Sequence, residues 1–206
     1  QRDFIMLYSH NNLQYVVAMM GAIHLGVTFC PTSHAFGPYE LTEHIRDFSG
    51  KVLVTDRNMI GTIEKALVGP EYADTMKCLD LVVQLESDKP NQNLMNHPIM
   101  AGKKILTFDQ MIMLGSGQRL KQIPYFPIEN YSTEHFLACF TSGTTGTPKL
   151  AVQTHRSFLA SLYNRTLGAS TYAEPNIHWH PLGHVCGTYR MLLGLLSGQS
   201  IVVFAK

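Results

Sequence analysis

The 206-residue sequence has few charged residues and no long apolar segment. Charged side chains make up 15% of it, and the formal net charge is +1. This balance provides no basic field that would attract nucleic acid. No apolar run is long enough to span a bilayer, and the start, Gln1-Arg2-Asp3, lacks the basic-then-apolar order of a secretory signal. We therefore predict a globular protein with no nucleic-acid partner and no transmembrane segment.

Cysteine is also scarce. The four cysteines, Cys30, Cys78, Cys139 and Cys186, lie far apart and form no Cys-x-x-Cys pair. Three of them lie in apolar runs, so we expect reduced thiols that pack as small hydrophobic side chains. With no secretory signal, this pattern predicts an intracellular protein, cytoplasmic or peroxisomal.

Strand-like and helix-like segments alternate along much of the chain. In residues 1–86, strands are expected at 4–8, 27–30, 51–55 and within 78–85, and helices at 13–25, 38–48 and 58–67. Pro31 is expected to stop the second strand. The alternation predicts a doubly wound α/β fold with mostly parallel strands.

The rest of the chain divides into two parts. Residues 87–131 are polar and rich in Pro and Asn at their start, and we expect mainly irregular loops there, with a strand edge and short helix at 105–113. Residues 132–206 return to an α/β pattern, with strands expected at 136–140, 150–153, 177–180 and 201–204 and helices at 156–168 and 185–196.

One nine-residue stretch differs from the rest of the chain. It reads Thr141-Ser142-Gly143-Thr144-Thr145-Gly146-Thr147-Pro148-Lys149, with an apolar run on each side. Glycines let backbone N–H groups approach an anion, hydroxyls add donors, and lysine adds a positive charge. We therefore predict a phosphate-binding loop between two strands, formed by Thr141, Ser142, Gly143, Thr144, Thr145, Gly146, Thr147 and Lys149.

The spacing excludes the P-loop of nucleotide hydrolases, which needs Gly, four residues and then Gly-Lys-Ser/Thr. Here Thr147 and Pro148 separate Gly146 from Lys149, and Leu150 follows the lysine. The stretch resembles instead the signature loop of the adenylate-forming superfamily, Ser/Thr-Ser-Gly-Thr-Thr-Gly-x-Pro-Lys, at every position. That superfamily contains acyl-CoA synthetases, 4-coumarate–CoA ligases, luciferases and the adenylation domains of peptide synthetases. A surface hairpin turn rich in Thr and Gly is the alternative.

Earlier segments resemble the same superfamily in the same order. They are the turn Ser9-His10-Asn11, a helix ending at Gly26, a strand ending at Pro31, and Glu40-Leu41 before the next helix. The resemblance covers most of the chain. It implies part of a large N-terminal domain, with mostly parallel sheet layers flanked by helices, and a C-terminal domain that lies outside these 206 residues.

His184 is a second candidate. Pro181-Leu182-Gly183-His184 resembles a family segment of Pro, two variable residues and His, in which the histidine faces the acyl carboxylate and the adenylate phosphate. An imidazole can donate to an anionic oxygen, so the resemblance implies a catalytic role. Relatives often carry larger residues at Gly183 and Cys186, which predicts a reshaped acyl pocket. A capping or packed histidine is the alternative.

Other residues carry weaker signals. His178, His180 and His184 suggest zinc, and the first two would point the same way on a strand. No Asp or Glu is interleaved and no later ligand is evident, so we predict no metal ligands. Thr154-His155 is expected to cap a helix. Lys206 is a weak candidate for the coenzyme A path by resemblance, and Leu150 stands where relatives carry glycine.

By resemblance, the parent enzyme activates a carboxylic acid. The carboxylate attacks the α-phosphate of Mg-ATP, pyrophosphate leaves, and a thiol takes the acyl group, which implies ATP, Mg²⁺ and coenzyme A. The family's adenine-binding and ribose-binding segments and its C-terminal lysine are absent from these residues, so we expect the chain alone to be inactive. A non-catalytic, truncated nucleotide- or acyl-binding relative is the alternative. The sequence does not separate aryl from fatty acids, or ligation from luciferase-like oxidation.

Overall fold

The computed structural model of the chain describes residues 4–116, 127–141, 148–166 and 175–204. The strands are β1 (Phe4–Tyr8), β2 (Thr28–Thr32), β3 (Val52–Asp56), β4 (Leu81–Leu85), β5 (Lys104–Thr107), β6 (His135–Thr141), β7 (Lys149–Thr154), β8 (Asn176–His178) and β9 (Ile201–Val203). The α-helices are α1 (Leu13–His24), α2 (Pro38–Phe48), α3 (Ile60–Val68), α4 (Pro70–Met76), α5 (Gln92–Asn96), α6 (Phe108–Ser116), α7 (His155–Thr166) and α8 (Val185–Leu196). Two 3₁₀ turns are η1 (Arg57–Met59) and η2 (Pro98–Met100).

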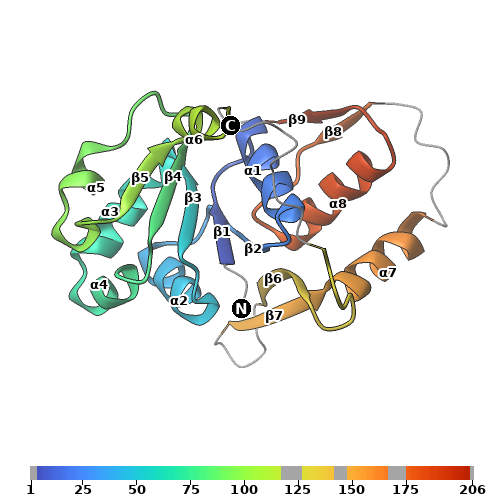
Figure 1. Ribbon diagram of the computed structural model, residues 1–206, viewed down its shortest axis with the longest axis horizontal. Coiled ribbons are helices and arrows are strands. Elements are labelled where there is room, and N and C mark those ends of the chain that lie inside the picture. Colours follow the sequence, from blue (N-terminus) through green and yellow to red (C-terminus); the bar gives the residue numbers. More distant parts are fainter. Residues whose placement is uncertain (1–3, 117–126, 142–147, 167–174, 205–206) are drawn as a thin grey trace.

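Seven strands form one sheet in the order β5-β4-β3-β1-β2-β6-β7, and β8 pairs with β9 in a second sheet (Figure 1). Neighbouring strands are parallel except β6 and β7, which form an antiparallel hairpin. The prediction of an α/β fold with mostly parallel strands is therefore confirmed.

Helices cover both faces of the large sheet. Met6 and Tyr8 face one core, which α2 and α3 cover with residues such as Ile45 and Ile63. Leu7 faces the other core, which is covered by α1, α7 and α8. Burial on both faces explains why the strands read as continuous apolar runs rather than as alternating patterns.

Successive strands are added first on one side of β1, as β2, and then on its other side, as β3, β4 and β5. The chain leaves β1 for α1 on one face, and it leaves β2 for α2 on the opposite face before it returns to β3 on the far side of β1. Ligands of open α/β sheets bind outside the carboxyl ends of strands at such a switch point. The carboxyl ends of β1 and β3, the adjacent strands between which the order reverses, are therefore the place where a site is expected.

Two details differ from the sequence-based expectations. Pro31 does not stop the second strand, because β2 continues to Thr32; the fixed φ of proline is compatible with extended backbone, and the missing N–H falls one residue before the strand ends. The helix α4 was not expected; it begins with Pro70 and buries Met76.

Residues 87–131 are more regular than expected. The strand and short helix predicted at 105–113 are present as β5 and α6, but α5 and η2 also lie in this segment. Asn91 caps α5 by accepting a hydrogen bond from the Leu94 backbone N–H at 3.0 Å. Leu94 and Met100 are buried in the first core. A polar composition concealed these turns because each has only one fully buried apolar side chain.

The lengths and the polarity of the helices decide whether any of them could span a membrane. In the part of the chain that the structure describes, no helix combines the length and the apolar character that crossing a membrane requires.

Candidate functional site

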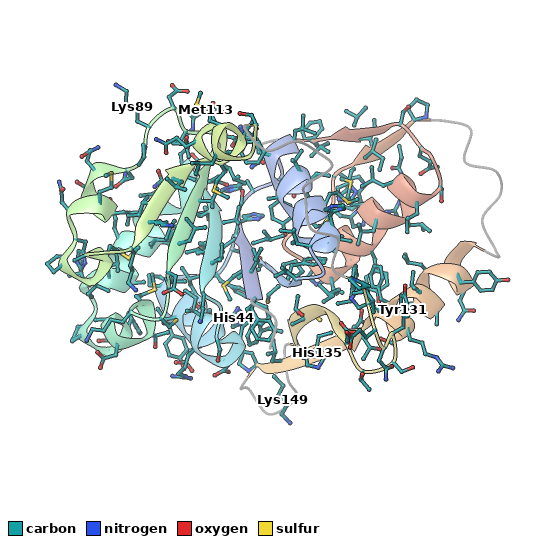
Figure 2. The ribbon with its side chains drawn as sticks, viewed as in Figure 1. His44, Lys89, Met113, Tyr131, His135 and Lys149 are labelled. Atoms are coloured by element: carbon teal, nitrogen blue, oxygen red, sulfur yellow. The ribbon has the colours of Figure 1, made fainter. Side chains whose placement is uncertain are left out.

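The predicted phosphate loop connects the two strands of the β6–β7 hairpin. Thr141 ends β6 and Lys149 begins β7, and these two residues form the pair next to the loop. The Thr141 hydroxyl donates to the Lys149 carbonyl oxygen at 3.3 Å. Both residues are exposed, and the Lys149 side chain extends away from the body of the protein (Figure 2). The structure thus brings together a hydroxyl and a cation at the two ends of the loop. The other predicted phosphate ligands, Ser142, Gly143, Thr144, Thr145, Gly146 and Thr147, lie outside the described residues.

An aromatic stack holds the strand that leads into this loop. The ring of Phe140 stacks on His44 of α2 with centroids 3.5 Å apart and an interplanar angle of 4°. Phe36 contacts the same imidazole edge-on at 4.8 Å. His44 is 1% exposed, and burial lowers its pKa from 6.5 to about 4. The imidazole is therefore neutral near pH 7, and within the described residues neither ring nitrogen has a hydrogen-bond partner.

Leu150 belongs to the same packing. It pairs with Phe140 across the hairpin and contacts the first core. Its extended backbone needs no glycine, because strand geometry is open to any branched apolar residue. The departure from the family pattern at this position therefore fits β7 without strain.

His184 stands immediately before α8 and caps it. Its Nδ1 accepts a hydrogen bond from the Cys186 backbone N–H at 3.2 Å. A nitrogen that accepts carries no proton, so the neutral ring has its proton on Nε2. The side chain is exposed. The capping alternative is therefore observed at Nδ1, and it leaves the anion-facing role of Nε2 as a prediction.

Asn11 fixes the turn that carries His184. Its side-chain Oδ1 accepts from the Leu182 backbone N–H at 2.7 Å, and its Nδ2 donates to the His180 carbonyl oxygen at 2.8 Å. Asn11 ends the short turn after β1, so this pair of hydrogen bonds fastens residues 180–182 to the carboxyl edge of the large sheet. The sequence identified the Ser9-His10-Asn11 turn but contained no signal for its distant partner.

Two glycines allow the turn to lie this close. A Cβ on Gly183 would overlap the Thr32 carbonyl group at the end of β2, and a Cβ on Gly187 would overlap the Pro181 carbonyl group. Backbone contacts of this kind admit glycine alone. From the sequence, the small residue at Gly183 was expected to reshape an acyl pocket. The structure gives a local reason for glycine at this position, which is its close contact with the end of β2.

Asp56, at the end of β3, anchors the turn after β1. One carboxylate oxygen accepts from the Ser9 hydroxyl at 3.0 Å and from the His10 backbone N–H and Nδ1 at 2.6 and 2.9 Å. Burial acts to raise the pKa of Asp56, but the hydrogen bonds that it accepts are stronger in sum and lower it. An ionised Asp56 therefore holds the backbone immediately before Asn11.

A groove begins beside His184. It has a volume of about 480 Å³ and lies between β7, α7 and α8, lined by Gln153, Ser161, Asn164, Val185, Cys186 and Tyr189. The Tyr189 hydroxyl donates to Gln153 Oε1 at 2.6 Å. Because the Cys186 N–H is also the donor to His184, the groove and the imidazole are directly connected.

Of the other candidates, His178, His180 and Thr154 do not line this groove. The strand β8 ends at His178, and the rings of His178 and His180 lie 6.2 Å apart. The described residues contain no group of three or more His, Cys, Asp or Glu that could hold a metal ion. Thr154 caps α7 as predicted, since its hydroxyl accepts from the Ser157 N–H at 3.3 Å. Lys206 lies outside the described residues.

The expectation for the cysteines was correct only in part. All four are free; Cys30 is buried and Cys139 is half-buried, but Cys78 and Cys186 are exposed. An apolar neighbourhood in sequence does not bury a residue that lies on the outer side of a helix turn, as Cys186 does in α8.

A mostly parallel sheet with an antiparallel edge hairpin and helices on both faces is the fold of the N-terminal domain of adenylate-forming enzymes. The chain belongs to the AMP-binding enzyme family, and the match to this family extends over residues 1–206.

Similar proteins agree with this assignment. The chain is 21% identical to acyl-CoA synthetase 7 of Caenorhabditis elegans and 22% identical to 4-coumarate–CoA ligase 3 of Arabidopsis thaliana, with 99% of the chain aligned in each case. It spans about a third of the length of these relatives, 36% and 33%.

Solved structures show the same fold. The anthranilate CoA ligase AuaEII, in complex with anthranoyl-AMP, matches all of the chain with a TM-score of 0.79 and 17% identity, and the chain covers 36% of it. A red-emitting luciferase from Phrixothrix hirtus matches 97% of the chain with a TM-score of 0.77 and 15% identity, and 36% of that protein is covered.

Proposed function

We propose that the protein containing this chain uses ATP to activate a carboxylic acid as an acyl-adenylate and transfers the acyl group to coenzyme A. The observation that supports this proposal is the β6–β7 hairpin, in which Thr141 and Lys149 flank the predicted phosphate loop in a chain of the AMP-binding family. Because the chain spans about a third of its relatives, the activity is proposed for the complete protein. The 206 residues alone should not complete the reaction.

The residues present fit an anionic nucleotide. Lys149 is exposed and long enough to balance part of the charge of a leaving pyrophosphate, and the loop hydroxyls add donors. His184 would donate from Nε2 to an oxygen of the carboxylate or of the adenylate phosphate. Preorganisation comes from the hairpin for Lys149 and from Asn11 for His184.

Mg²⁺ and coenzyme A are proposed from the family alone. The described residues offer no cluster of metal ligands, so we derive no step through Mg²⁺. Mg²⁺ would supply further charge neutralisation at the phosphates. Lys206, the one residue suggested for the coenzyme A path, lies outside the described residues.

The test is acid-dependent pyrophosphate release by the complete protein, measured over a panel of carboxylic acids. In Lys149→Ala, kcat/KM for ATP should fall by about a hundredfold, the cost of removing one preorganised donor to developing charge. Lys89→Ala is the matched control, because Lys89 is an exposed lysine far from the hairpin (Figure 2). Equal effects of the two substitutions would refute the role of Lys149.

Two further outcomes separate the alternatives. ATP binding without pyrophosphate release for any acid would favour the non-catalytic nucleotide-binding relative. Pyrophosphate exchange by the isolated 206 residues would show that the chain is sufficient on its own, contrary to this proposal.

A further inference from the structure

The groove beside His184 presents uncharged hydrogen-bonding groups. Four of its six lining residues, Gln153, Ser161, Asn164 and Tyr189, carry an amide or a hydroxyl, and none of the six is an acidic or a basic residue. A second hollow of about 280 Å³, between α1, α7 and α8, is by contrast almost entirely apolar and is lined by residues such as Met20, Leu159 and Leu196. Polarity is thus a property of the groove next to the candidate catalytic residue and not of this whole side of the protein.

The Gln153 amide is held in place by a hydrogen bond from α8. Tyr189, which is 6% exposed, donates its hydroxyl proton to Gln153 Oε1 at 2.6 Å. That bond occupies the amide oxygen and leaves the Nε2 donors of Gln153 for a ligand. Cys186, at the first turn of α8, connects the groove to the His184 ring through its backbone N–H.

We propose that this groove selects a compact carboxylic acid whose acyl part carries uncharged hydroxyl groups, in preference to a long alkyl acid. The inference rests on the proposed function, in which His184 binds the carboxylate end and the remainder of the acid enters the adjoining groove. Covering Gln153, Ser161 and Asn164 with an alkyl chain would leave their donors without partners, which is costly, whereas a hydroxyl group satisfies them. A second carboxylate would find no compensating charge there.

The experiment compares hydroxybenzoates with benzoate and octanoate as substrates of the complete protein. The three hydroxybenzoate isomers are each measured, and kcat/KM is taken from acid-dependent pyrophosphate release. The best hydroxybenzoate should exceed both benzoate and octanoate by about tenfold or more, since a site built to bond a hydroxyl discriminates against the analogue that lacks it.

Variants then test the groove itself. Gln153→Leu should reduce the hydroxybenzoate-to-benzoate ratio to within about twofold, while KM for ATP stays unchanged. Gln153→Met is the second variant if Gln153→Leu does not fold, because it keeps the length of the side chain but removes the amide and adds no charge; the same loss of preference is expected. Gln92→Leu is the matched control, because Gln92 is exposed on α5, outside the groove.

Two results would overturn the inference while the proposed function stands. They are a preference for octanoate over every hydroxybenzoate, and an unchanged substrate ratio in both Gln153 variants. Failure of all acids to release pyrophosphate would instead refute the proposed function and this inference together.

Discussion

Replacing Asn11 by alanine should separate the positioning of His184 from the folding of the domain. Asn11 makes two hydrogen bonds to a turn that lies far away in the sequence, one to the Leu182 N–H and one to the His180 carbonyl. Alanine removes both and adds no bulk. The Tyr15 and Thr188 hydroxyls still donate to the Leu182 carbonyl, at 3.2 and 2.9 Å, so the turn keeps part of its anchoring.

The size of the effect follows from burial. Leu182 is 0% exposed, so its N–H would lose its partner in a place that water does not reach. An unsatisfied buried donor costs about 1–3 kcal/mol, and the half-buried His180 carbonyl adds about 1 kcal/mol. We therefore expect Asn11→Ala to lower the free energy of unfolding by about 2–4 kcal/mol. If the turn opens locally to admit water, the loss of stability will be smaller and the displacement of His184 larger.

Two measurements check this prediction. Urea denaturation reports the change in stability, and steady-state pyrophosphate release by the complete protein reports the position of His184. The value of kcat/KM for the acid should fall by about a hundredfold, as expected for a displacement of about 1 Å, while KM for ATP stays within about twofold. A decrease in stability with unchanged acid kinetics would show that Asn11 has a structural role only. Equal losses for the acid and for ATP would also refute the positioning role.

Two further predictions concern other contacts of the site. Because burial lowers the pKa of His44 from 6.5 to about 4, the unfolded state binds more protons between these values and stability falls as the pH drops through them. His44→Phe should remove this loss, about 3 kcal/mol at pH 4 relative to pH 7, in urea titrations; equal pH slopes in both proteins would contradict it. Gly183→Ala should lower kcat/KM for the acid by about a hundredfold, because its Cβ overlaps Thr32 and moves the turn. In the control Gly61→Ala, which meets no atom within 4 Å, stability should rise by about 1 kcal/mol.

Local signals in the sequence predicted much of the fold. Five apolar residues before Ser9 predicted β1, and Gly26, with φ of 64°, ends α1 as a residue tolerant of that conformation should. Short elements such as α4 and α5 were missed, because one buried residue in a polar segment gives no periodic pattern. The order of the strands in the sheet could not be predicted either, because an apolar run does not indicate which other strand it pairs with.

The candidate site divides in the same way. Lys149 and His184 were predicted from motifs, because the chemistry proposed for them requires particular residue types at fixed spacing. Asn11 and Asp56 were not assigned roles, because their partners lie far away in the chain and nothing local marks such a contact. The groove was also missed, since it combines side chains from β7, α7 and α8.

The strand order also determines when the phosphate-loop hairpin can form during folding. The five strands from β1 to β5 all come from the first 107 residues and are neighbours in the sheet, so they can pair early. The strand β6 joins them only by meeting β2, through the pairing of Leu137 with Phe29, after the chain has crossed from the opposite edge of the sheet. Contacts between such distant residues carry a large loop-closure cost and slow folding. Until β6 arrives, the outer edge of β2 stays open to other chains, so the nascent protein is most prone to aggregation before its phosphate loop is in place.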